Sequence, residues 1–200
     1  IIQLGNSGVY VIYDELEGKE AVTWSYLLHT VELPMEMKEL PNEVQVTGKN
    51  KAGGVSVAHL FSSAKTEQAI ADTFFCAPTN WKNVTNAQGK ALKYPNHWHF
   101  SSTTVPCKVA RFLTVMDTHG NNRPDMKVVR NGNTVQVGDW VINCNLAEKG
   151  KAAITVTNKS EKVSLNYDAG KKEGATIVTD QIKGKQISKV LTDYLPDFEI

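Results

Sequence analysis

Hydrophobic and polar residues alternate with a period of two along most of this chain, which predicts β-strands. In His97–Thr103 the histidines lie on one face and the aromatic residues on the other. The next segment, Cys107–Met116, is apolar on both faces except at two basic positions, which is typical of a central strand covered on both sides. Pro106 fits a corner between them, because proline has no N–H to donate within a sheet. We therefore place this pair of strands in the middle of a β-sandwich.

Shorter segments with the same period predict further strands before this pair. Val9–Tyr13 is rich in β-branched and aromatic residues and leads into a polar connection over residues 14–20. Residues 21–30 alternate well enough to predict one long strand, whereas the proline-bounded segment 33–41 is expected to be irregular. Two more strands are expected, at 44–47 and 55–61.

Residues 65–72 form a segment in which we predict a short helix. Ser63 is placed to cap it and Glu67 follows four residues later, a spacing that satisfies free N–H groups in a first turn. So short a helix depends on tertiary packing for its stability. Residues 74–76 are expected to form a brief strand, and the polar segment 77–93 a long loop.

Residues 117–125 are polar and follow the last strongly apolar strand, so we predict a domain boundary there. Beyond it, Asn131-Gly132 separates two short β-rich segments, and this dipeptide tolerates the positive φ of a tight hairpin turn. Further strands are expected at 140–146, 152–157, 163–167 and 175–179, with a strand or short helix at 185–195. The chain is thus predicted to be all-β, with an antiparallel β-sandwich over residues 1–116 followed by a smaller β module over residues 117–200.

Composition excludes several classes of partner. Hydrophobic residues make up 41% of the 200 positions, and 22 basic against 21 acidic side chains leave a net charge of +1. We expect neither nucleic acid nor membrane as a partner, because the sequence shows no basic stripe and no apolar run of roughly 20 residues. The chain opens on strand-like residues without an initiator methionine, which suggests a processed chain or a fragment.

Three cysteines, Cys76, Cys107 and Cys144, lie among apolar residues, and none has the spacing of a zinc site. We expect buried free thiols. An odd number excludes a fully paired set of intrachain disulfides and leaves the redox compartment open.

Candidate chemistry gathers on the strand at 97–103. His97 and His99 share a face roughly 7 Å apart, and they can hold a metal ion if a third ligand comes from elsewhere; the alternative is two ordinary histidines on an exposed strand. Trp98 points to the other face, where it either stacks on a sugar or packs in the core.

Arg111 either contacts an acidic sugar or forms a structural ion pair with a buried carboxylate. His59, on an apolar strand face, is more typical of a satisfied core histidine than of a metal ligand. Spacing alone assembles no catalytic set, and no Ser-His-Asp set or phosphate-binding loop is present, so no catalytic residue is assigned.

Two parts of the chain resemble the later β region of heparinase II/III-like polysaccharide lyases. They are the segments Val9–Glu17 with Trp24–His29, and His99–Phe100 with Ala110–Val115. The resemblance implies that residues 1–116 are the second part of a large β-sandwich domain and that residues 117–200 are a small C-terminal β module. An α/α toroid and the upstream half of the sandwich would precede them.

That family cleaves uronic-acid polysaccharides by β-elimination, with catalytic groups and a metal site mainly in the parts that precede this region. The resemblance therefore implies a mainly structural C-terminal β portion of a heparin or heparan sulfate lyase, with no cofactor of its own, although zinc or calcium is possible in the parent enzyme. The implied partners are the N-terminal part of the same enzyme, the polysaccharide and a second copy of the chain in a homodimer, in the periplasm or outside the cell. The alternative is a non-catalytic carbohydrate-binding β-sandwich, suggested by Trp98 and the loop at 77–93.

Overall fold

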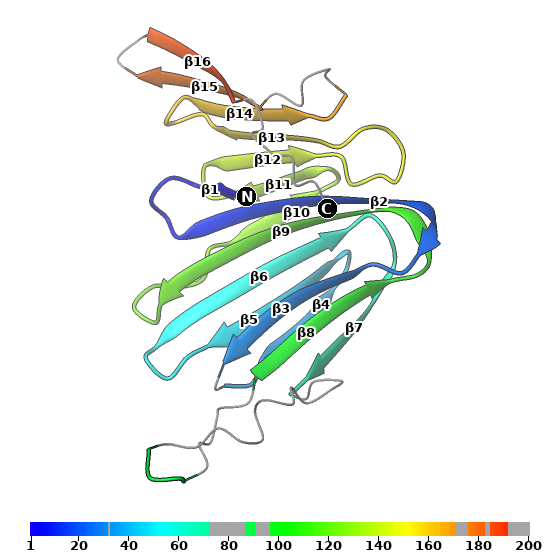
Figure 1. Cartoon of the computed structure of the whole chain (residues 1–200). Coiled ribbons are helices and arrows are strands. Elements are labelled where there is room, and N and C mark those ends of the chain that lie inside the picture. Colours follow the sequence, from blue (N-terminus) through cyan, green and yellow to red (C-terminus); the bar gives the residue numbers. More distant parts are fainter. Residues whose placement is uncertain (32, 73–86, 91–96, 171–175, 183–184, 192–200) are drawn as a thin grey trace.

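The computed structural model describes residues 1–31, 33–72, 87–90, 97–170, 176–182 and 185–191. Every regular element in these ranges is a β-strand, and all the strand pairs are antiparallel within three sheets (Figure 1). No helix in these ranges is long and apolar enough to cross a membrane. The predicted all-β class is confirmed.

A six-stranded sheet, which we call the central sheet, is the middle layer. Its strands in spatial order are β1 (Ile2–Gln3), β2 (Val9–Val22), β9 (Cys107–Gly120), β6 (Gly54–Ser62), β5 (Glu43–Lys49) and β4 (Glu36–Leu40). Strand β9 pairs with β2 on one side and β6 on the other. This interior position is the one predicted from its two-sided apolar sequence.

A three-stranded sheet covers one face of the central sheet. Its strands in order are β3 (Ser25–Val31), β8 (His97–Thr104) and β7 (Thr66–Ala71). The chain passes from β8 to β9 through Val105 and Pro106, so the predicted corner carries it from one sheet to the other. The core between these sheets comprises Met35, Val46, Ala58, Leu60, Phe100, Ala110 and Phe112. The predicted sandwich is therefore present, with β8 and β9 in opposite layers.

A seven-stranded C-terminal sheet covers the other face of the central sheet (Figure 1, yellow-green to red). Its strands in order are β10 (Val128–Asn131), β11 (Thr134–Val137), β12 (Trp140–Cys144), β13 (Ala153–Asn158), β14 (Val163–Asp168), β15 (Thr176–Ile182) and β16 (Lys185–Leu191). On β9, Leu113 and Val115 face this second core while Phe112 faces the first. Successive side chains of β9 therefore point alternately into the two cores.

The predicted helix at residues 65–72 is wrong, because Thr66–Ala71 forms strand β7. Gln68 and Ile70 are half-buried while Glu67 and Ala69 are exposed, which is the alternation of a strand. Pairing with β8 supplies the segment with backbone hydrogen bonds, whereas a helix of two turns would be marginal without packing.

The first strand boundaries also differ from the prediction. Strand β2 runs from Val9 through the supposed polar connection to Val22, with an irregular register after Glu17. The single long strand expected at 21–30 is divided at Thr23-Trp24, where the chain changes sheets. Trp24 fixes this corner through its backbone N–H to Thr104 Oγ1 at 3.0 Å and its indole N–H to the Cys107 carbonyl at 3.1 Å.

Three more expectations concern boundaries. The segment 33–41, expected to be irregular, contains the edge strand β4. Of the segment 185–195, expected to be a strand or a short helix, residues 185–191 form strand β16 and the rest lies outside the described residues. Strand β9 continues to Gly120, so the residues just after the boundary predicted at 117 still belong to the central sheet. The strand expected at 74–76 and most of the loop at 77–93 lie outside the described residues. The predicted hairpin is confirmed, but its turn lies one residue later than predicted, because Asn131 pairs with Thr134 at the end of β10 and the two turn residues are Gly132 and Asn133.

Gly8 and Gly132 offer a matched test of backbone constraint. Both have positive φ, +75° and +60°, but a Cβ on Gly8 would collide with the Thr118 carbonyl, whereas one on Gly132 meets nothing within 4 Å. We expect Gly132→Ala to cost about 1 kcal/mol for its left-handed backbone, and Gly8→Ala at least about 2 kcal/mol because overpacking is added. Urea unfolding of both variants checks this, and equal costs would contradict it.

Candidate functional site

The four candidate residues from the sequence lie in three separate environments. Trp98 faces inward and packs against the core between the central and three-stranded sheets. Arg111 faces the C-terminal sheet and is 2% exposed. His97 and His99 alternate with Trp98 on β8 and so lie on the outer face of the three-stranded sheet. The structure does not bring these four side chains into one site.

Arg111 ties the central sheet to the C-terminal sheet. Its Nε donates to Glu15 Oε2 at 2.5 Å, and its terminal nitrogens donate to the carbonyls of Ala147 and, at 2.6 Å, Gly150. A guanidinium with these partners is held within the protein. The placement favours the structural ion pair over contact with a sugar, just as the inward placement of Trp98 favours a core role.

Tyr13 and Tyr26, which are partly buried against different cores on the two faces of the central sheet, do not suit a tyrosinate base. Burial raises the pKa of Tyr13 to about 12, and the Tyr13 hydroxyl donates to the Asn145 carbonyl at 2.7 Å. Burial also raises the pKa of Tyr26, whose ring packs 5.6 Å from that of Phe112. A general base needs a pKa nearer the working pH, so these two environments favour packing over proton abstraction.

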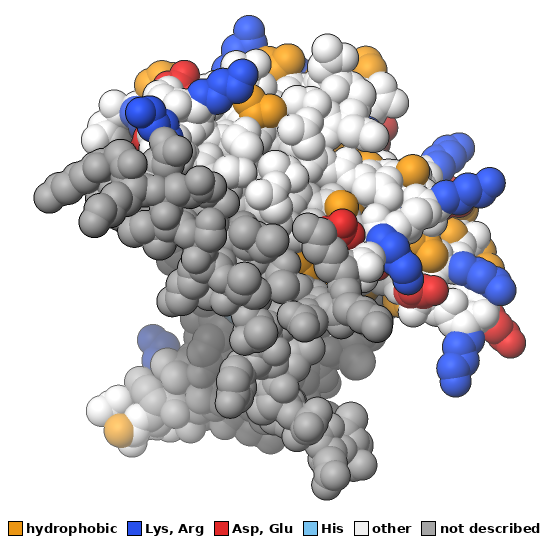
Figure 2. All heavy atoms as spheres, turned by 90° about the horizontal axis from the view of Figure 1, so that it is seen from above, with side chains coloured by type: hydrophobic (Ala, Val, Ile, Leu, Met, Phe, Trp, Pro, Cys, Tyr) orange, Lys and Arg blue, Asp and Glu red, His pale blue; other side chains and the backbone are white. Residues whose placement is uncertain are grey.

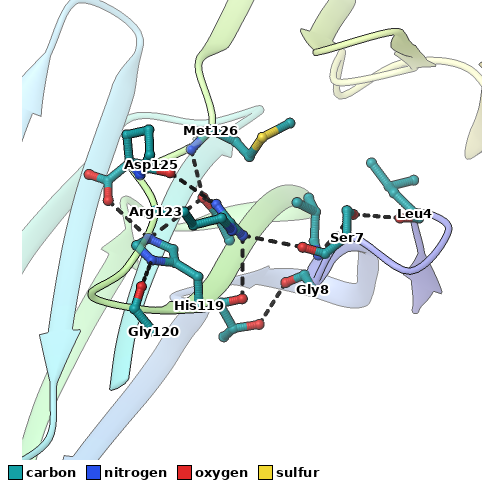
Figure 3. Close-up of polar contacts among 12 residues, drawn as sticks. Leu4, Ser7, Gly8, His119, Gly120, Arg123, Asp125 and Met126 are labelled. Atoms are coloured by element: carbon teal, nitrogen blue, oxygen red, sulfur yellow. Dashed lines mark hydrogen bonds and ion pairs between the residues drawn. The ribbon is translucent and has the colours of Figure 1, made fainter. Parts of the chain in front are cut away.

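A second polar cluster joins the end of β9 to the segment that leads into the C-terminal sheet (Figure 3). The Asp117 carboxylate is fully buried and accepts hydrogen bonds from both terminal nitrogens of Arg123 and from the Met126 N–H at 2.6 Å. Burial alone would raise the pKa of Asp117, but the hydrogen bonds from Arg123 and Met126 outweigh it and lower the pKa below its usual range. Arg123 also donates to the Ser7 carbonyl at 3.2 Å.

His119 completes this cluster. Its Nε2 lies 3.0 Å from Asp125 Oδ1 and 3.8 Å from Asp117 Oδ2, and its Nδ1 lies 2.6 Å from the Gly120 carbonyl oxygen. An Asp-His pair is a common part of catalytic sites, but this imidazole is 3% exposed and both nitrogens face oxygen atoms of the protein. The arrangement therefore fits a structural junction better than a proton shuttle.

His59 is a core histidine, as its strand position predicts, but only one of its ring nitrogens is satisfied, because the buried Nε2 has no hydrogen-bond partner among the described residues. Its Nδ1 lies 2.6 Å from Glu43 Oε1, and both side chains are largely buried. This pair joins β5 to β6 within the central sheet.

The outer face of the three-stranded sheet carries a histidine that sequence reasoning missed. His29 on β3 lies directly opposite His99 on β8, with ring centres 5.9 Å apart. The signal was absent because the pairing register of strands 70 residues apart cannot be derived from spacing. Among the described residues, no group of three or more His, Cys, Asp or Glu side chains is placed to hold a metal ion.

An open groove of about 470 Å³ lies beside the β4–β5 and β6–β7 turns and the first hairpin of the C-terminal sheet. Its lining includes carboxylate, amide, hydroxyl and cationic groups, from Glu39, Glu43, Lys65, Gln68, Ser102 and Arg130. Arg130 is fixed over the Phe61 ring at 5.3 Å and donates to the Asn42 carbonyl at 3.1 Å. Such a mixture of polar groups can bind sugar hydroxyls and carboxylates.

The described surface shows no concentration of positive charge on the face seen in Figure 2. Lys and Arg side chains are scattered there, and several have Asp or Glu side chains beside them. This distribution agrees with the net charge of +1 and does not resemble the basic track of a polyanion-binding protein.

Cys144 and Cys107 are free thiols, buried and half-buried respectively, while Cys76 lies outside the described residues. Burial raises the pKa of the Cys144 thiol to about 11. In a Cys76→Ala/Cys107→Ala variant we expect Cys144 to react with a disulfide reagent at least about 100-fold more slowly than an exposed cysteine, because the thiolate is the reactive form. Denaturant should restore the rate, and fast labelling of the folded variant would contradict the buried position.

No family model matches this chain, and a search of curated proteins finds no match either.

Proposed function

We propose that this chain is the mainly structural C-terminal β portion of a heparinase II/III-like polysaccharide lyase, which cleaves heparin- or heparan sulfate-type uronic-acid polysaccharides by β-elimination. The segments that carry the resemblance occupy β2, β3, β8 and β9, which bound both cores of the structure. The observation that carries the structural role is that Arg111, Tyr13 and Asp117 are used to hold the sheets together.

β-Elimination needs a base, a group that neutralises the substrate carboxylate and an acid for the leaving oxygen. Among the described residues, the side chains of Arg111 and His119 are buried and that of Tyr13 is half-buried, and all three are engaged with protein oxygens. We assign the reacting groups to the N-terminal part of the same enzyme, together with any zinc or calcium. A homodimer and a periplasmic or extracellular location belong to the same proposal.

The test is to isolate the source protein and determine its intact mass, its N-terminal sequence and its release of unsaturated uronides from heparin and heparan sulfate. We expect a polypeptide with a mass well above 22.1 kDa and with lyase activity, and no turnover by the 200-residue chain alone. A source protein of this mass, or robust turnover by the isolated chain, would contradict the proposal.

The groove at Arg130 supports a second candidate, a non-catalytic carbohydrate-binding module. It predicts that heparan sulfate, chondroitin or alginate fragments bind the isolated chain and that Arg130→Ala weakens binding at least about fivefold, since the guanidinium can pair with a carboxylate or sulfate. Lys108→Ala, at an exposed position on β9, is the matched control. No binding of any fragment at millimolar concentration removes this candidate.

A further inference from the structure

We propose that His29 and His99 form a cross-strand site for a divalent transition-metal ion of the Zn²⁺, Ni²⁺ and Cu²⁺ class. The site lies on the outer face of the three-stranded sheet, the face turned away from the central sheet. It is independent of the lyase proposal, and it differs from the same-strand pair His97 and His99 that the sequence suggests.

The geometry of the two rings carries this proposal. His29 and His99 are directly opposed in the register of β3 and β8, and their ring centres are 5.9 Å apart with planes inclined by 42°. Two imidazoles that bind one zinc ion through bonds of about 2.0–2.1 Å hold their ring centres roughly 5–6 Å apart. The distance between the two ring centres is therefore within the range that a shared metal ion requires.

The neighbouring histidine is less well placed. His97 lies two residues along β8 from His99, a separation of roughly 7 Å between backbone positions. The residue opposite His97 in the register is Val31, which has no metal-binding side chain. His97 thus provides a matched control on the same strand and the same face.

Among the described residues, the pair is most open on the side of His29. His29 is exposed, and on its other side His99 is opposed by Ala71, whose methyl group occupies little space. The Nδ1 of His99 is buried, so we assign Nε2 as its ligand atom. The remaining coordination positions would be filled by water or by oxygen atoms of a bound molecule.

The type of ligand determines the type of metal ion. Imidazole nitrogen suits Zn²⁺, Ni²⁺ and Cu²⁺, and affinity rises from Ni²⁺ to Cu²⁺ in the general order for such sites. Ca²⁺ and Mg²⁺ require oxygen ligands and should not compete. Since the metal binds neutral imidazole, protons compete with it and acidification should weaken binding.

The test is calorimetric titration of the full 200-residue chain with Zn²⁺ at neutral pH, with Ca²⁺ as the negative ion. We expect one equivalent of Zn²⁺ to bind, and His29→Gln and His99→Gln each to lower the affinity at least about tenfold, since even loss of a supporting outer-shell partner costs 10–100-fold. His97→Gln should leave the affinity unchanged. With Cu²⁺, electron paramagnetic resonance should show two imidazole nitrogens in the wild type and one in His29→Gln.

Each other result overturns the proposal. Unchanged Zn²⁺ affinity in His29→Gln excludes the cross-strand pair, and a loss confined to His97→Gln and His99→Gln assigns the ion to the same strand. Absence of saturable binding of both Zn²⁺ and Cu²⁺ excludes the site altogether. Because His29 is exposed, its variant should unfold at the wild-type temperature, and this measurement separates loss of a ligand from loss of the fold.

Discussion

Replacing Arg111 with methionine should lower the free energy of unfolding by about 3 kcal/mol, the lower end of the range for breaking a buried ion pair. Methionine fills similar space but donates no hydrogen bond. The Glu15 carboxylate and the carbonyls of Ala147 and Gly150 would lose their donors at the interface of two sheets. Glu15 is 27% exposed, so water can rehydrate part of its charge, and this is why we expect the lower end.

Urea unfolding followed by circular dichroism measures this loss. Lys108→Met is the control, because Lys108 lies on the same strand but is exposed, and surface substitutions usually change stability by no more than about 0.5 kcal/mol. A cost for Arg111→Met as small as that of the control would show that the bonds to the C-terminal sheet contribute little.

The C-terminal sheet depends on the central sheet through more than this one side chain. The core that the two sheets share includes Val11 and Leu113 from the central sheet with Ile142 and Val156 from the C-terminal sheet. The central sheet is therefore buried on both faces, and the strand that crosses its middle, β9, contributes to both cores. A module joined only by a linker would not require a strand of this kind.

The sequence was sufficient to predict features that depend on local pattern. The two-sided apolar run of β9, the corner at Pro106 and the hairpin at Gly132 each follow from residues within one element. The helix expected at 65–72 failed because a weak local preference competed with pairing to β8, which lies about 30 residues away. Tertiary pairing decides the conformation of such short polar segments.

Contacts between distant strands were not predictable in the same way. The Glu15 partner of Arg111 is 96 residues away, and it lay in a segment expected to be a polar connection. His29 and His99 are brought together only by the register of β3 and β8. Asp117 and Arg123, in contrast, are only six residues apart. An aspartate at the end of an apolar run, followed closely by an arginine, is a sequence signal that could have predicted this pair.

Replacing Asp117 with asparagine should cost about 2–4 kcal/mol at neutral pH, because a fully buried carboxylate with three hydrogen-bond donors would be lost. Asparagine keeps the size of the side chain, but its NH₂ group cannot accept from Arg123 or from the Met126 N–H. Asp125→Asn is the matched control, since Asp125 contacts the same His119 but is 55% exposed. We expect the control to lose less than about 1 kcal/mol.

The difference between wild type and Asp117→Asn should also depend on pH. The folded protein lowers the pKa of Asp117, so the unfolded chain, with an ordinary aspartate pKa near 3.9, takes up the proton first as pH falls. The stabilisation is therefore complete above about pH 5 and is lost as pH falls through the lower pKa of the folded state. Burial raises the pKa of Asp14, which acts in the opposite direction, but both proteins contain Asp14 and its effect cancels. Urea unfolding of both proteins from neutral pH to about pH 2 should show that the difference in their free energies of unfolding becomes smaller. A difference that stays constant would mean that folding does not lower the pKa of Asp117.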